Sequence, residues 1–99
     1  MRSADRVAAA RHADGFQGRV KSPRTRCIKN RTVKVYRQLG RTQQPSSDQK
    51  LFTDTSDDTG HWDTGTSGQA HGKFYARTKR TTRCRTGTSD TITATNPLY

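Results

Sequence analysis

Two triplets, Asp58-Thr59-Gly60 and Asp63-Thr64-Gly65, are the residues of this chain whose types most suggest catalysis. In a chain of 99 residues, one such aspartate from each of two subunits would form the proton-sharing dyad of an aspartic protease. That dyad needs a buried apolar strand before each triplet, because only burial forces two carboxylates together. The triplets here follow Ser56-Asp57 and His61-Trp62 instead. The sequence therefore predicts no catalytic residues and a protein that is not an enzyme.

The same acidic segment offers oxygen ligands of the kind that calcium prefers, from Asp54, Asp57, Asp58 and Asp63. An EF-hand loop would need acids at alternate positions and a final glutamate, and this chain contains no glutamate. Neither cysteine lies in a CxxC pair and the histidines are scattered, so zinc-ligand spacing is absent as well. Aspartates in tight turns are explained by hydrogen bonds to their own backbone. We expect no bound metal and no cofactor.

Positive charge is the strongest compositional signal, with 19 lysines and arginines against 8 acidic residues and a net charge of +11. Such a surface attracts polyanions. Two basic runs and two tyrosines that we expect to be exposed beside them are the polyanion-binding candidates: Arg24, Arg26, Lys29, Arg31, Arg77, Lys79, Arg80, Arg83, Arg85, Tyr36 and Tyr75. The alternative is a solvated basic surface that keeps the domain soluble and protects its edge strands.

Cys27 and Cys84 are the only cysteines. A disulfide between them would close most of the chain into a loop and contribute about 4 kcal/mol in the chain-entropy model. Two unpaired thiols in a cytosolic protein are the alternative.

Alternation of apolar and polar residues predicts strands over residues 16–21, 31–38, 73–79 and 89–95. Residues 1–15 are expected to be a flexible N-terminal arm, 16–95 a single domain and 96–99 a C-terminal tail. A polar loop is expected over residues 39–50. The predicted core is Phe16, Val20, Val33, Val35, Leu51, Trp62, Phe74, Ala76 and Ile92.

The segment from Leu51 to Asp63 is predicted to be a hairpin around which the other strands are arranged. Asp57, Asp58 and Gly60 supply the turn, through side-chain bonds to the backbone and a positive φ. Phe52 and Trp62 would then meet across the two strands.

Short strands with frequent turn signals and no convincing helix predict an all-β protein, either a small antiparallel β-sandwich or a small barrel, with about six or seven strands. No apolar segment is long enough for a membrane span. Residues 1–15 also lack the apolar region of a secretory signal peptide, so we expect no such signal there.

Several short segments share an order and spacing: FQGRVKS at 16–22, RTVKVYR at 31–37, DTGHW at 58–62, GKFYA at 72–76 and SDTI at 89–92, with a cysteine after the first and before the last. Together, over Phe16 to Ala94, they resemble the carboxypeptidase-regulatory-like, or transthyretin-like, domains of bacterial secreted proteins. The resemblance implies a prealbumin-like or Ig-like β-sandwich that is extracellular and non-catalytic. It also implies that Cys27 and Cys84 pair, and it transfers no catalytic residue.

These observations favour a non-enzymatic structural or interaction module outside the cytoplasm or on the cell surface. Its basic surface would contact a protein, an anionic cell-surface polymer or a larger assembly. A cytosolic small β-barrel that binds nucleic acid or another polyanion is one alternative. A structural subunit of a virion or filament is another.

Overall fold

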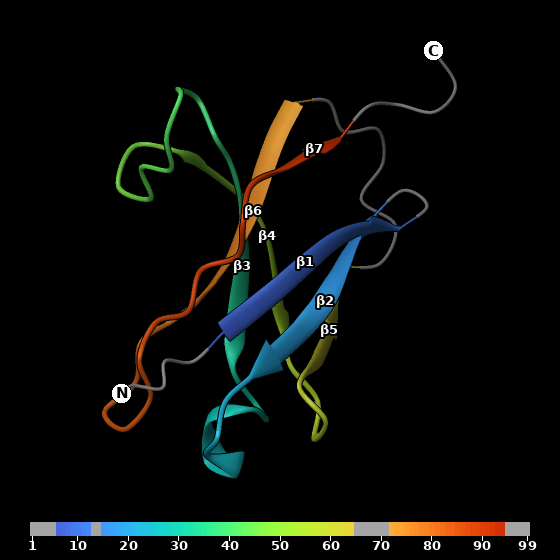
Figure 1. Cartoon of the computed structure of the whole chain (residues 1–99), viewed down its shortest axis with the longest axis vertical. Coiled ribbons are helices and arrows are strands. Elements are labelled where there is room, and N and C mark those ends of the chain that lie inside the picture. Colours follow the sequence, from blue (N-terminus) through green and yellow to red (C-terminus); the bar gives the residue numbers. More distant parts are fainter. Residues whose placement is uncertain (1–5, 13–14, 65–71, 95–99) are drawn as a thin grey trace.

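The protein is a sandwich of two antiparallel sheets, as the computed structural model shows for residues 6–12, 15–64 and 72–94. One sheet has the order β1-β2-β5 and the other β4-β3-β6-β7. The three-stranded sheet lies across the four-stranded sheet (Figure 1). The elements are β1 (Arg6–His12), β2 (Gly15–Lys21), the short 3₁₀ helix η1 (Thr25–Cys27), β3 (Thr32–Arg37), β4 (Gln49–Thr55), β5 (His61–Asp63), β6 (Gly72–Thr78) and β7 (Ile92–Ala94). The expected all-β antiparallel sandwich is confirmed.

The core lies between the inward faces of the two sheets, where alternate residues of each strand meet. Phe16 of β2 is central: its ring centroid lies 5.0 Å from that of Phe74 and 6.2 Å from that of Phe52. Of the predicted core residues, only Leu51 and Ile92 are partly exposed, and both still pack against the buried cluster. The cluster also contains Val7, which the sequence analysis did not include.

Residues 6–12 correct one expectation, because they form strand β1 rather than part of a flexible arm. The strand pairs along its whole length with β2, from Arg6 opposite Lys21 to His12 opposite Gly15. Alanine has a low strand propensity, so the segment RVAAARH carries a weak strand signal. Gly18 permits the pairing, since a Cβ there would lie 1.7 Å from the carbonyl oxygen of Ala8.

The predicted hairpin over Leu51 to Asp63 is wrong in its pairing. Strand β4 pairs with β3 in one sheet, while β5 pairs with β2 in the other. The turn chemistry itself is as expected: Oδ1 of Asp57 accepts the backbone N–H groups of Thr59 (2.8 Å) and His61 (3.0 Å), and Gly60 has φ +88°.

The pairing differs because the turn docks on β2. The carbonyl of Gly60 accepts the N–H of Val20 at 2.8 Å, and a Cβ on Gly60 would lie 2.3 Å from the carbonyl oxygen of Val20. The chain therefore crosses between the sheets at this turn. Phe52 packs against Phe16, and Trp62 enters the core from the opposite sheet.

Candidate functional site

A disulfide joins two loops at one end of the sandwich. Cys27 ends η1, and Cys84 lies in the connection between β6 and β7. Their Cα atoms are 5.5 Å apart, although the residues are separated by 57 positions in the sequence. The pairing that the resemblance implied is therefore present.

Arg31 reinforces this junction from inside, which corrects its assignment as a polyanion-binding candidate. The residue is only 2% exposed, so its charge is withdrawn from solvent. Its guanidinium donates to the carbonyls of Cys27 (2.9 Å), Lys79 (3.1 Å) and Arg85 (2.9 Å). The planar fork of an arginine suits such a role, because it reaches several acceptors at once. Arg31 is a structural clamp between the two disulfide-linked loops.

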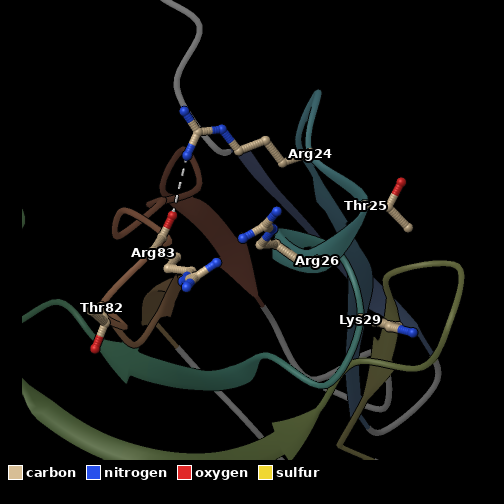
Figure 2. Close-up of a pocket in the computed structure, with 6 residues that line it drawn as sticks. All are labelled: Arg24, Thr25, Arg26, Lys29, Thr82 and Arg83. Carbon is tan, nitrogen blue, oxygen red and sulfur yellow. Dashed lines mark hydrogen bonds between the residues drawn. The ribbon is translucent and has the colours of Figure 1, made fainter.

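The two loops line an open hollow that we call the junction hollow, with a volume of about 890 Å³. Figure 2 shows its lining, which is Arg24, Thr25, Arg26, Lys29, Thr82 and Arg83. All six side chains are exposed. The Nη1 atom of Arg24 donates to the carbonyl of Arg83 at 3.5 Å, so a further contact joins the loops across the hollow.

The cations of the junction hollow are not neutralised within the described part of the chain. None of Arg24, Arg26, Lys29 and Arg83 forms an ion pair with a carboxylate of residues 6–12, 15–64 or 72–94. Their mutual repulsion is therefore relieved only by solvent, by salt or by an external anion. The structure thus groups four of the predicted candidates at one place.

The remaining basic candidates lie mostly in a second hollow, over the outer face of the four-stranded sheet. We call it the sheet hollow; its lining is Lys34, Tyr36, Arg77, Thr78, Lys79, Arg80 and Thr86. Arg85 is exposed, but its carbonyl is bound to Arg31 and its side chain lines neither hollow. Sequence analysis missed Lys34, which stands alone on a strand rather than in a basic run.

Tyr36 and Tyr75 are corrected as exposed stacking groups, since they are only 9% and 0% exposed. Their rings stack on each other, with centroids 5.3 Å apart and planes 7° from parallel. The alternation correctly puts both on the outer face, but the loop after β3 folds over that face, and Oη of Tyr75 donates to Oδ2 of Asp48 at 2.6 Å. At this low exposure neither ring offers a face on which a base could stack.

The contact between Tyr75 and Asp48 also shifts the pKa of both side chains. Burial of Tyr75, and then its hydrogen bond to Asp48, raises the pKa of the phenol. That same bond, with the N–H groups of Leu39 and Gln44, holds the pKa of the Asp48 carboxyl below its ordinary value. The pair anchors the loop and presents no free acid or base to a substrate.

The aspartates of the turn segment serve the backbone. Oδ1 of Asp57 accepts hydrogen bonds from the hydroxyl and the N–H of Thr59. These two bonds are the main reason why the pKa of the Asp57 carboxyl is lowered. Oδ2 of Asp54 accepts the N–H of Asp63 at 2.7 Å, while Asp58 is exposed.

Among the described residues, no three His, Cys or Asp side chains are grouped as metal ligands would be. Nor does any helix in those ranges have the length and apolar character needed to cross a membrane.

The fold and the two hollows thus define a disulfide-linked β-sandwich with a basic end. Comparison of the chain with protein-family models, with curated proteins and with solved structures gives no significant match.

Proposed function

We propose that this protein is a non-enzymatic interaction module that acts outside the cytoplasm and binds an anionic cell-surface polymer in the junction hollow. The observation that supports this most directly is the lining itself. Three arginines and one lysine, drawn from two loops that a disulfide joins, face one hollow without ion-pair partners among the described residues.

The chemistry of the lining suits binding better than catalysis. Guanidinium groups offer paired donors that match the oxygens of phosphate or carboxylate, and hydroxyls of Thr25 and Thr82 can add single hydrogen bonds. The lining residues include no carboxylate, imidazole or thiol that would act as a general base or nucleophile. Because the cations are exposed, each contact would be weak, and affinity would come from several anionic groups on one chain.

The disulfide supports the proposed location. Paired cysteines persist in oxidising compartments and are rare in the cytosol, so the Cys27–Cys84 bond is compatible with a protein outside the cytoplasm. We also propose that the chain belongs to the transthyretin-like, carboxypeptidase-regulatory-like domains. The sandwich and the cysteine pair support that assignment.

The test is binding to purified teichoic acid, measured by titration calorimetry at several salt concentrations. One variant neutralises the junction hollow through Arg26→Gln, Lys29→Gln and Arg83→Gln. A control variant removes the same charge from exposed positions in or beside β3 and β6, through Arg37→Gln, Arg41→Gln and Lys73→Gln. We expect the first variant to bind at least about tenfold more weakly than the control, because its contacts with the polymer are local.

Equal weakening in both variants would contradict the proposal, since it would mean that only net charge matters. Single-stranded DNA is titrated in parallel. Binding to DNA that is tighter than binding to teichoic acid at the same salt would favour the nucleic-acid alternative instead.

A further inference from the structure

Lys34 and Arg77 occupy directly opposed positions on the paired strands β3 and β6. Both side chains lie on the outer face of the sheet, because their neighbours Val33, Val35 and Ala76 are buried in the core. Like charges at opposed positions of an antiparallel pair destabilise a sheet. The sheet hollow therefore contains a pairing that lowers stability when no anion is present.

No acid of the neighbouring strands relieves this pair. On β4, the residue opposite Lys34 is Thr53, whereas Asp54 is opposite Val33 and its side chain binds the N–H of Asp63 in the other sheet. Asp48, which reaches this face, is held by Tyr75. Neither Lys34 nor Arg77 forms an ion pair with any carboxylate in the part of the chain that the structure describes.

The surroundings of the pair extend the positive charge rather than balance it. Lys79 and Arg80 line the same hollow as Lys34 and Arg77, and the last two side chains are only half-exposed. Two cations at opposed positions of paired strands can each bind one oxygen of a single oxyanion.

The sheet hollow also lies next to the junction hollow. Arg80 lines the first and Arg83 lines the second, and three residues of chain span at most about 11 Å. The loop between them is fixed, because the N–H of Thr81 donates to the carbonyl of Cys84 at 3.0 Å and the N–H of Cys84 donates to Oγ1 of Thr81 at 3.0 Å. The two hollows therefore keep a constant spacing.

From these observations we infer that the sheet hollow is a second anion subsite, centred on Lys34 and Arg77, and that the ligand is a polymer with repeating oxyanions long enough to occupy both hollows. This inference rests on the proposed function for the junction hollow and adds a requirement for chain length. Binding to two linked subsites multiplies affinity only for a chain that reaches both.

The test uses tripolyphosphate and long-chain polyphosphate as short and long probes of identical chemistry. The variants are Lys34→Glu, which opposes Arg77 with a carboxylate, and Lys34→Gln, which only removes the charge. We expect Lys34→Glu to weaken binding of the long chain by at least about tenfold, with Lys34→Gln intermediate. Short-chain binding at the junction hollow should change by less than about twofold, since Lys34 does not line that hollow.

Melting temperatures provide an independent readout. Without ligand, Lys34→Glu should melt a few degrees higher than the wild type, because an opposed like-charge pair becomes an ion pair. Long-chain polyphosphate should raise the melting temperature of the wild type more than that of Lys34→Glu.

Failures of the two proposals are distinguishable. If the long chain binds wild type and Lys34→Glu equally well, and neutralising the junction hollow abolishes binding, the second subsite is wrong and the proposed function stands. If neutralising the junction hollow has no effect while Lys34→Glu abolishes binding, the proposed function is wrong and the sheet hollow is the site. If polyphosphate neither binds the wild type nor changes its melting temperature, both are wrong.

Discussion

Removal of the disulfide should destabilise this protein by about 4 kcal/mol, because the bond closes a loop between residues 57 positions apart. The chain-entropy model assigns that loss to the unfolded state, which gains freedom once the loop is open. Native domains typically have a free energy of unfolding of about 5–15 kcal/mol, so the stability that remains without the disulfide would be small. The native state should nevertheless keep its structure, since Arg31 still binds the carbonyls of Cys27, Lys79 and Arg85.

The measurement compares the wild type with the double variant Cys27→Ala/Cys84→Ala in urea, followed by the fluorescence of Trp62. This residue is the only tryptophan and is 1% exposed, so unfolding exposes it fully. The reduced wild type serves as a second route to the same open chain, without the change in side-chain volume. A loss of less than about 1 kcal/mol by both routes would refute the loop-closure reasoning.

Three further outcomes are expected from equilibrium unfolding. Gly60→Ala should lower the free energy of unfolding by about 1–3 kcal/mol, because a Cβ at this positive φ would meet the carbonyl of Val20. Gly40→Ala is the control and should be neutral, since a Cβ there has nothing within 4 Å; equal effects of the two substitutions would contradict the prediction. Arg31→Met should lower the free energy of unfolding by at least about 2 kcal/mol, because the carbonyls that Arg31 binds lose a charged donor. An unchanged stability would contradict the structural role given to Arg31. The pKa of the Asp48 carboxyl is lowered in the folded state, so its contribution is present above about pH 4 and is lost as the pH falls further. Tyr75→Phe, which removes the first cause of that shift, should flatten the acid limb of the stability profile, and an unchanged limb would contradict the assignment.

The strands were predictable where apolar residues alternate. The segments of β2, β3 and β6 carry Phe16, Val33, Val35 and Phe74 on one face, and a periodicity of two is sufficient to place such residues in a core. Strand β1 was not predictable in this way. Its pairing depends on the absence of a side chain at Gly18. Gly18 belongs to β2, so the sequence of β1 alone gives no sign of this pairing.

The pairing of β4 and β5 shows a different limit. A turn motif specifies a local reversal, and the reversal around Asp57 forms as expected. It does not specify which sheet the next strand joins. Here the contact between Gly60 and Val20 decides that, and this contact joins residues far apart in the sequence.

The sequence predicted which basic residues are candidates for the site, but not how they are arranged in space. The basic runs contained the four cations of the junction hollow but did not group them, and the same pattern included Arg31, which is buried because its fork matches carbonyls brought together by the fold. Tyr36 and Tyr75 were placed on the correct face, and only the tertiary path of the loop that holds Asp48 covers them. Lys34 was missed because it stands alone on its strand, and its position opposite Arg77 follows only from the pairing of β3 with β6.

Covalent closure and charge act in opposite directions at the junction hollow. Arg24, Arg26 and Lys29 on one loop and Arg83 on the other line the same hollow, so their repulsion favours separation of the loops. The Cys27–Cys84 bond prevents that separation. A disulfide at this position thus allows the domain to keep a concentrated positive charge without separation of the two loops, and under the proposed function an anionic chain bound there would relieve the remaining repulsion.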